Sequence, residues 1–379
     1  MDSAESVQNG VTPATVSEAV GAAAHHAEAA DTNRMLPAVV SRALITSGFA
    51  RHFVPSRWGG ADGGANALLE ATALVGAECT SAAWCGALAA GAARMGVYLP
   101  ERGQAEIWAD TADVLIAGAL IPQGTAEPVA GGMRLRGRWD WTSGVDHADW
   151  ALVAASVSHT DPSGTWFFAV PSAQFRVEDT WFNTGMRGTG SNTLVLDDIV
   201  VPAYRAFDRE EMFAGRAVGS SASCHTAPLQ AISGLLFAAP ALGAARGALR
   251  EWSRQISRTS SSGQSRAEQP AVQTVAARSA SEVDAAELLL SRVGHVVDRG
   301  DPTHEELLRG AYDCAVATDL LVGVVERLFR AAGSRGQLCS SALQRFWRDV
   351  HCLSSHVALQ LEPSGIAYGS HLLRAYRPE

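Results

Sequence analysis

Apolar and polar residues recur with two different periods along this chain of 379 residues, and the period changes twice. Between residues 31 and 113 the apolar positions have the spacing of helices, and from about residue 228 onward that spacing returns. The stretch between them alternates every second residue, which is typical of half-buried strands. The pattern therefore predicts an N-terminal helical domain (31–113), a central β domain (114–225) and a C-terminal four-helix bundle (226–379), behind a flexible tail (1–30).

Helix ends and linkers divide the two helical regions further. In the N-terminal region a helix is expected to end near Gly48, and the stretches 66–96 and 101–110 are expected to be helical. In the C-terminal region a polar linker, "SRTSSSGQSRAEQP", separates the first two of four long helices. Those helices are expected over residues 228–258, 270–299, 303–332 and 340–360.

The strand with the clearest alternation is "MRLRGRWDW", which begins at Met133. One face is expected to carry Met133, Leu135, Trp139 and Trp141, and the other Arg134, Arg136, Arg138 and Asp140. The strand ends at Thr142, Ser143 and Gly144, where hydroxyl and N–H groups can bond the edge of a flat heterocycle while an indole covers its face. A buried tryptophan pair before an ordinary Ser-Gly turn explains the same residues, so this segment alone leaves both interpretations open.

The composition excludes several partners and chemistries. The chain has 39 acidic and 30 basic residues, a formal charge of −9, which disfavours binding to nucleic acid phosphates. Every basic residue is arginine, so neither a Schiff-base lysine nor a P-loop lysine is available. The sequence has no secretory signal pattern and no run of about 20 apolar residues, so we expect a soluble, cytoplasmic protein that does not enter a membrane.

The cysteines and histidines do not favour a metal site. The six cysteines are far apart and form no Cys-x-x-Cys pair, so we expect reduced thiols. None of the 11 histidines follows a glutamate by three residues, which excludes the usual di-iron arrangement of helical bundles. No Gly-x-Ser-x-Gly motif occurs, and the glycines of "GMRGTGSNT" lack the dinucleotide-binding spacing. We therefore expect no metal, no hydrolase elbow and no Rossmann fold.

Four segments together resemble the acyl-CoA dehydrogenase superfamily. They are "GGMRLRGRWDWTSGVDHADW", "MRGTGSNTLVLDDIVVP", "LQRFWRDVHCLSSH" and "IAYGSHLL", and the resemblance extends over about residues 30–375. Within the superfamily the chain is most similar to the oxygenase components of two-component flavin-dependent monooxygenases. The resemblance implies a mainly α protein with a central β domain, the acyl-CoA dehydrogenase-like fold.

The same resemblance assigns a flavin-binding role to residues in three parts of the chain. It implies that Ser143 bonds the flavin ring near N5, with Trp141 and Thr142 along the same edge. It also implies that Arg258 meets the flavin phosphate, often across a subunit boundary. Gly333, Ser334 and Arg335 form a turn that approaches the phosphate end. The cofactors implied are reduced FAD or FMN and O₂.

His356 bears on which reaction is expected. Most dehydrogenases of the superfamily carry a glutamate base eight residues after the aspartate of their Arg-Asp pair, a position occupied here by Val357. The resemblance implies that His356 instead helps to form a C4a-hydroperoxyflavin and takes the proton of the substrate, roles that suit an imidazole. A histidine packed in the core of a helix is the other interpretation of this residue.

The substrate pocket is expected to include Trp84, Tyr368 and His371. The helix after Trp84 lacks a histidine that relatives often bring into the pocket, which favours a roomier site and a multi-ring substrate. The expected function is therefore the hydroxylation of an aromatic or polycyclic small molecule, polyketide- or indole-like, in secondary metabolism such as antibiotic biosynthesis. A separate NAD(P)H flavin reductase is the expected partner, and the chain is expected to assemble into a homotetramer.

Two alternatives to this function remain at this point. The first keeps the fold but changes the reaction, to a flavin dehydrogenase or an amino-sugar N-oxygenase. The second is a non-catalytic binding protein with the same fold.

Overall fold

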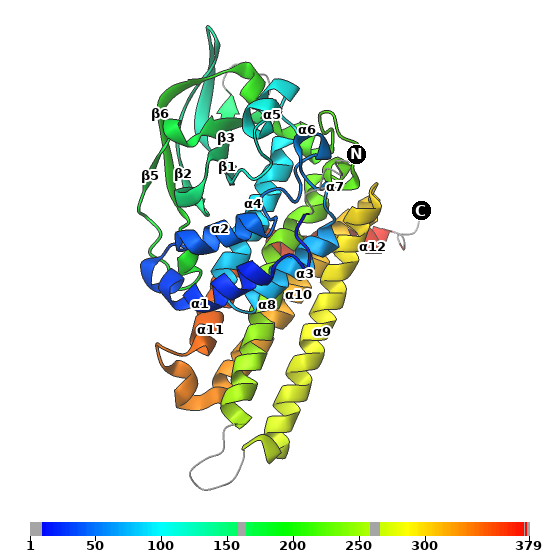
Figure 1. Ribbon diagram of the computed structural model, residues 1–379. Coiled ribbons are helices and arrows are strands. Elements are labelled where there is room, and N and C mark those ends of the chain that lie inside the picture. Colours follow the sequence, from blue (N-terminus) through cyan, green and yellow to red (C-terminus); the bar gives the residue numbers. More distant parts are fainter. Residues whose placement is uncertain (1–9, 158–163, 258–265, 375, 377–379) are drawn as a thin grey trace, which may run out of the picture.

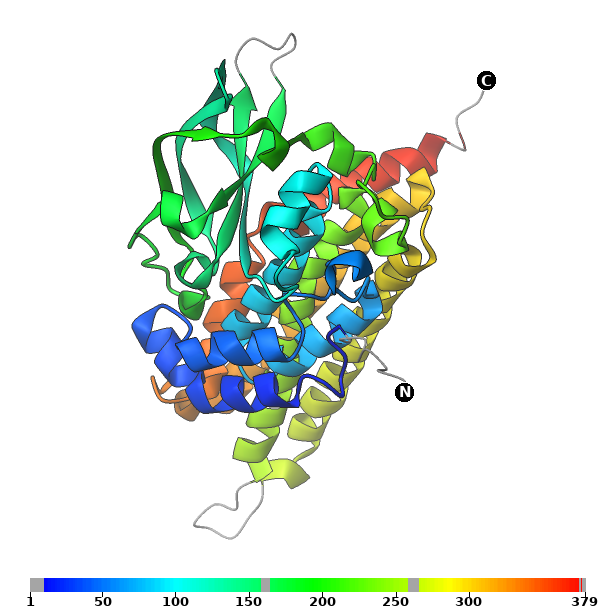
Figure 2. The same ribbon diagram turned by 45° about the horizontal axis from the view of Figure 1, so that its top comes forward.

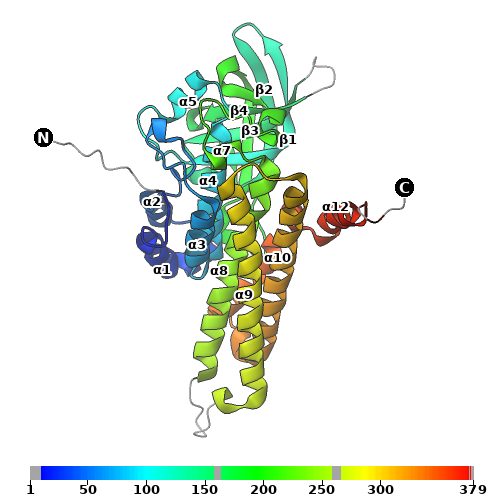
Figure 3. The ribbon, with the colours of Figure 1, turned by 90° about the vertical axis from the view of Figure 1, so that its right-hand side faces the viewer.

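The computed structural model describes residues 10–157, 164–257, 266–374 and 376, and it places a β-sheet at one end of a long helical body (Figure 1, Figure 3). The helices are α1 Ser17–Asn33, α2 Ala38–Thr46, α3 Ala65–Gly76, α4 Thr80–Gly96, α5 Glu101–Trp108, α6 Arg209–Phe213, α7 Ser223–Thr226, α8 Leu229–Ser257, α9 Pro270–Arg299, α10 His304–Ala332, α11 Ala342–Leu353 and α12 Leu361–Arg374. The strands are β1 Ile116–Val129, β2 Gly132–Thr142, β3 Trp150–Val157, β4 Thr165–Pro171, β5 Arg176–Glu178, β6 Asn192–Val201 and β7 Ala206–Asp208. The order of helices, strands and helices confirms the expected fold class.

The strands form one sheet in the order β5-β6-β2-β1-β3-β4-β7. Neighbouring strands run antiparallel except for β1 and β3, which are parallel. Helix α4 packs against β1, and Figure 2 shows α1 and α2, in blue, below the sheet and alongside the bundle. The sheet therefore meets the helical body at the edge where β2 ends.

Helix α8 is the centre of the helical body, because it packs against α3, α4, α9, α10 and α11. One hydrophobic core joins the N-terminal helices to the bundle. A side chain at Gly243 would lie 2.4 Å from the Ala73 carbonyl oxygen, so this glycine lets α8 approach α3 closely. By length and composition α8 alone among the described helices could cross a membrane, but 78% of its apolar window is buried inside the protein. Packing within the core accounts for its apolar character.

The N-terminal segment differs from the flexible tail expected over 1–30. Residues 17–30 belong to α1, whose buried face is formed by alanines spaced three or four residues apart: Ala19, Ala23, Ala27 and Ala30. Alanine is the strongest helix former, and its small side chain allows close packing. The expectation of a tail is therefore wrong for this part of the segment, because alanine contributes little to an amphipathic signal.

The last helix of the bundle is shorter than expected. Three of the four long helices are confirmed as α8, α9 and α10, but the fourth ends at Leu353 rather than at residue 360. The Ser354 and Ser355 hydroxyls donate hydrogen bonds back to main-chain carbonyls three residues earlier, which competes with continuation of the helix. His356 therefore lies in the turn that follows α11, and a separate helix, α12, begins at Leu361. The helical stretch 66–96 is likewise divided into α3 and α4.

The two tryptophans of β2 do not share a face, contrary to the alternation of the sequence. Trp139 is fully buried and its indole Nε1 donates to the Ala154 carbonyl at 2.6 Å. Trp141 is 63% exposed and has φ 61°, in the left-handed region. The pairing of β2 with β6 shifts register between Trp139 and Thr142, and this irregularity ends the strict alternation.

Candidate active site

A line of hydrogen-bonded hydroxyl groups lies at the end of β2. Trp84 of α4 donates its indole Nε1–H to the Ser143 Oγ at 3.0 Å. The Ser143 Oγ lies 2.8 Å from the Ser191 Oγ, which lies 2.7 Å from the Thr189 Oγ1. The Thr189 hydroxyl donates to the Met186 carbonyl at 2.8 Å. This line joins α4, the end of β2 and the loop before β6.

Three aromatic rings form the helical side of the same site. The His356 imidazole is stacked on Phe237 of α8, with ring centroids 3.7 Å apart and planes 26° apart. Trp84 meets the imidazole edge-on at 5.8 Å and contacts Phe237 at 5.2 Å. Trp84 thus contacts both His356 and Ser143, which brings together two residues 213 positions apart in the sequence (356 − 143).

The environment of His356 determines its charge and its tautomer. Burial lowers the pKa of His356 from 6.5 to about 4, so the imidazole is neutral at pH 7. Its Nδ1 accepts the backbone N–H of Ala358 at 3.2 Å, which places His356 at the start of the short 3₁₀ turn Val357–Leu359. In a neutral imidazole one nitrogen accepts and the other carries the proton. The proton therefore resides on Nε2, which is a hydrogen-bond donor.

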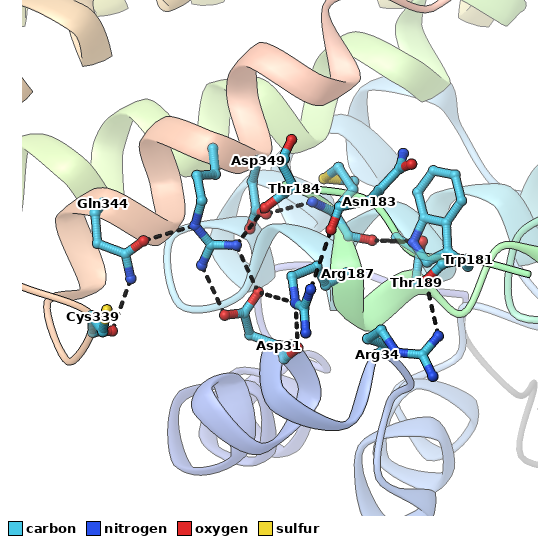
Figure 4. Close-up of polar contacts among 12 residues, drawn as sticks. Asp31, Arg34, Trp181, Asn183, Thr184, Arg187, Thr189, Cys339, Gln344 and Asp349 are labelled. Carbon is cyan, nitrogen blue, oxygen red and sulfur yellow. Dashed lines mark hydrogen bonds and ion pairs between the residues drawn. The ribbon is translucent and has the colours of Figure 1, made fainter.

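A network of ion pairs holds the loop that carries Thr189 and Ser191 (Figure 4). The Asp31 carboxylate of α1 pairs with Arg348 of α11 at 2.8 Å and with Arg187 at 3.6 Å. The buried Asp349 accepts the Met186 backbone N–H at 2.6 Å, and burial raises the pKa of Asp349 to about 6. The loop is therefore clamped between the first helix and the last helix of the bundle.

A small cleft of about 30 Å³ borders the strand end on the side of α2. It is lined in part by Ser143, Gly144 and Cys85, and by Leu44 of α2. His147, on the same cleft, has its Nε2 2.7 Å from the Leu36 carbonyl oxygen. The cleft has room for an ordered water or two, but not for an aromatic ring.

Of the residues expected at the flavin edge, Trp141 is exposed and Thr142 is buried. The indole of Trp141 is exposed next to Ser143, at the end of the strand. The side chain of Thr142 is buried, and its hydroxyl donates to the Trp139 carbonyl at 3.0 Å. The Thr142 side chain does not reach the edge, contrary to expectation, because the irregularity between Trp139 and Thr142 ends the alternation of β2 and turns this side chain inward.

Three of the residues expected at the flavin phosphate are separated from His356 by the length of a helix. Gly333, Ser334 and Arg335 are exposed in the 3₁₀ turn Gly333–Gln337, between α10 and α11. Helix α11 separates this turn from His356, and its 12 residues correspond to about 18 Å. Arg258 lies outside the described residues.

Two of the residues expected in the substrate pocket lie on α12 and face α10. Tyr368 lies 6.2 Å from Tyr312 between ring centroids, and His371 lies 5.7 Å from His304. The His371 Nε2 is also 3.8 Å from a carboxylate oxygen of Glu305. Figure 3 shows α12 projecting from the side of the bundle. A single chain therefore brings only Trp84 of the three expected pocket residues to Ser143 and His356, because α12 is a separate helix that continues away from the turn.

Sequence reasoning missed Phe237, Thr189 and Ser191 as parts of the site. Phe237 belongs to an apolar helix in which many residues are buried, so nothing distinguishes it from its neighbours. Thr189 and Ser191 stand in "MRGTGSNT", where small hydroxyl residues alternate with glycines before a strand. That pattern was a usable signal, because glycine allows the tight turn that brings neighbouring hydroxyls together.

Comparison with known proteins gives consistent similarities over most of the chain. Residues 235–361 match the family model described as "Acyl-CoA dehydrogenase, C-terminal domain". The oxygenase subunit HsaA of a flavin-dependent monooxygenase from Mycobacterium tuberculosis is 30% identical over 91% of this chain and 91% of its own length. The oxygenase component of an FADH₂-dependent resorcinol hydroxylase from Rhizobium sp. is 30% identical over 90% of this chain and 88% of its own length.

A solved structure supports the same similarity. The structure of XiaF from Streptomyces sp. in complex with FADH₂ and glycerol superposes with a TM-score of 0.89. It is 25% identical in sequence, and the match covers 95% of each chain. The similarity therefore includes the sheet, the N-terminal helices and the bundle together.

Proposed function

The chain belongs to the family of oxygenase components of two-component flavin-dependent monooxygenases, and from this premise we propose that it hydroxylates an aromatic, multi-ring small molecule with reduced flavin and O₂. The observation that carries the proposal is the meeting of Ser143 and His356 through Trp84. One side of this site is a strand end with hydrogen-bonding groups, and the other is a desolvated imidazole. A flat redox cofactor needs the first, and a reaction that must exclude water needs the second.

The residues at the strand end fit a flavin ring. Ser143 offers a hydroxyl oxygen at the level of the strand end, and Trp141 offers an exposed indole that the face of a flat ring can cover. We propose that Ser143 faces N5 of the flavin and that Trp141 covers part of the ring. When bound, reduced flavin supplies the activation of O₂, and the protein supplies orientation and a dry cavity.

His356 acts in this proposal as a neutral hydrogen-bond donor. Its Nε2–H is available because Nδ1 already accepts a backbone N–H. Phe237 is stacked on one face of the ring and Trp84 contacts it edge-on, and with these contacts the ring is half-buried. A donor of this kind can stabilise a negatively charged oxygen as it develops. The arrangement supports the stabilising role expected of His356 more directly than the role of a base, which requires a free lone pair.

A dehydrogenase of the same fold is less well supported. Val357, at the position of the usual glutamate base, is an exposed aliphatic residue. Glu362 is exposed in the first turn of α12, on the other side of the 3₁₀ turn from His356. The proposal of an oxygenase does not require a carboxylate at either place.

Assembly into a homotetramer is part of the proposal. The exposed turn Gly333–Arg335 lies at the end of α11 opposite His356, so a flavin bound at Ser143 would meet the corresponding turn and Arg258 of a neighbouring chain. A guanidinium suits the phosphate end of a flavin. We also propose a diffusible supply of reduced flavin from a separate NAD(P)H flavin reductase, and a cytoplasmic location. Light scattering at micromolar concentration tests the assembly, and a monomer would contradict it.

The experiment that tests the function is a mass measurement. The full-length protein is incubated in air with reduced FAD or FMN, generated by any flavin reductase, and with a panel of phenols and fused-ring aromatics. We expect a product heavier than its substrate by one oxygen atom. Loss of two hydrogen atoms would indicate a dehydrogenase, and oxygen consumption unaffected by any substrate would contradict the proposal.

A further inference from the structure

The hydrogen bonds around Ser143 have a direction that the two ends of the line determine. At one end the Trp84 indole N–H can only donate, so the Ser143 Oγ accepts from it. At the other end the Met186 carbonyl can only accept, so the Thr189 hydroxyl proton points to it. These two assignments need no assumption about the positions of hydroxyl protons.

The two hydroxyl–hydroxyl contacts between these ends then have one consistent orientation. Because the Thr189 proton is used by Met186, the Thr189 oxygen must accept from Ser191. The Ser191 proton is used in this way, so the Ser191 oxygen must accept from Ser143. The reverse orientation would place two oxygen lone pairs opposite each other at 2.7 Å or 2.8 Å. The proton of Ser143 is therefore directed to Ser191, away from the strand end.

Most groups in this line are buried, so water cannot offer their hydroxyls other hydrogen-bond partners. Thr189 is 2% exposed, Ser191 4% and Trp84 8%, whereas Ser143, at the open end of the line, is half-buried. A hydroxyl in contact with solvent can turn to suit any partner, whereas a buried one is held by its neighbours. The Ser143 oxygen has two lone pairs, and Trp84 uses one of them. Ser143 can therefore accept one more hydrogen bond but has no proton to donate.

We propose that this line of hydroxyls makes Ser143 an obligate acceptor that selects reduced flavin over oxidised flavin. N5 of a reduced flavin carries a hydrogen and donates, whereas N5 of an oxidised flavin has a lone pair and accepts. Reduced flavin gains a hydrogen bond at Ser143, and oxidised flavin meets an opposed lone pair. Ser191, Thr189 and Trp84 are positioning residues, and the inference rests on the proposed placement of N5 at Ser143.

The test measures binding rather than turnover. Purified full-length protein is titrated with oxidised FAD in air and with reduced FAD under anaerobic conditions, and the ratio of the two dissociation constants is compared between variants. Ser191→Ala removes the acceptor of the Ser143 proton, which is then free to bond an oxidised N5. We expect the preference for reduced FAD to fall by about tenfold, which corresponds to a shift of roughly 30 mV in the potential of the bound flavin.

Two further variants distinguish an effect of hydrogen-bond direction from a general disturbance of the site. Trp84→Phe removes the donor at the other end but leaves the Ser143 proton with Ser191, so we expect no tighter binding of oxidised FAD. Thr189→Ser keeps the hydroxyl and removes only a methyl group, so it should retain the wild-type preference. If Ser191→Ala does not fold, Thr189→Val removes the acceptor of the Ser191 proton with little change of volume and should lower the preference in the same direction.

Each outcome decides between the inference and the function on which it rests. If Ser143→Ala alters the preference for reduced FAD but neither Ser191→Ala nor Thr189→Val does, the direction of the hydroxyls has no role and the inference is overturned. The inference is also overturned if Trp84→Phe tightens the binding of oxidised FAD as much as Ser191→Ala does. If Ser143→Ala changes neither dissociation constant, N5 does not lie at Ser143 and the proposed placement of the flavin fails as well.

Discussion

The strand side and the helical side of the candidate site are built by different forces. On the strand side, Ser143, Ser191 and Thr189 are held by hydrogen bonds between their hydroxyl groups and to a main-chain carbonyl. On the helical side, His356 is held mainly by contact with the rings of Phe237 and Trp84, and burial lowers its pKa to about 4. Directional bonds determine which atoms donate, whereas apolar packing determines which charge state is stable.

This difference teaches where each side is sensitive to mutation. A hydrogen-bonded side loses orientation when one hydroxyl is removed, but the net free energy of each bond is small. On the helical side, removal of one aromatic ring admits water and changes the protonation state that is stable for the imidazole. We therefore expect larger effects from the helical side, and the following experiments are ordered accordingly.

The largest effect is expected from His356→Ala. Loss of the Nε2–H donor should lower hydroxylation by about 10²–10³-fold, the range for removal of one donor to a developing oxyanion. Oxygen would still be consumed but would be released as hydrogen peroxide, so product and peroxide should be measured together. His351→Ala, on α11 five residues earlier, is the matched control and should retain coupling. Wild-type coupling in His356→Ala would reduce His356 to a packing residue.

His356→Asn separates the two roles of this side chain. Asparagine can donate a hydrogen bond but cannot take a proton at neutral pH. If the donor role dominates, this variant should recover part of the coupling that His356→Ala loses. Coupling as low as in His356→Ala would instead favour the role of a base.

The next effect is a loss of stability in acid. The pKa of His356 is about 4 in the folded protein and near 6.5 when unfolded, so the unfolded state binds more protons between these values. Stability is therefore lost as the pH falls from 6.5 towards 4, by at most about 3 kcal/mol from this residue. Urea unfolding at several pH values should show a smaller acid loss in His356→Phe than in wild type. His52, whose pKa is also lowered to about 4, is present in both proteins and contributes the same acid loss to each. An identical total loss in the two proteins would mean that the pKa of His356 is not lowered by burial.

A smaller effect is expected on the strand side from Trp141→Ala. The exposed indole is proposed to cover one face of the flavin, and an aromatic contact contributes about 0.5–1.5 kcal/mol beyond its buried area. Flavin affinity should fall by roughly tenfold, while stability should change little because the side chain is 63% exposed. Phe182→Ala, which removes another exposed aromatic ring, is the control. Unchanged flavin affinity would place the ring elsewhere.

The smallest effect is expected from Ser143→Ala. A single hydrogen bond contributes about 0.5–1.5 kcal/mol, so affinity for reduced FAD should fall by roughly two- to tenfold. Anaerobic titration measures this change, and the affinity for oxidised FAD should not fall, because the variant also removes the lone pair that opposes an oxidised N5. An equal loss for both forms would indicate that Ser143 acts only through the shape of the turn.

Several features of the fold were predictable from local pattern. The helices α8, α9 and α10 are long enough for the helical period to be clear, and the strands of the β domain alternate between polar turns. Ser143 and Trp141 were predictable from one continuous segment, whereas Thr189 and Ser191, which complete the strand side, were missed. Features that depend on few residues were not predictable, such as the end of α11 at Leu353, which two serine hydroxyls produce.

The sequence by itself determined the family, the order of helices and strands, and the identity of Ser143 and His356 as residues to examine. Only the tertiary structure decided that Trp139 is buried while Trp141 is exposed, that Nδ1 of His356 accepts a backbone N–H, and that Ser143 lies in a line of hydroxyls between an indole N–H and a carbonyl. The physical reason is range. Periodicity and motifs describe neighbours along the chain, whereas burial, tautomer and hydrogen-bond direction depend on partners from distant segments that meet only in the folded protein.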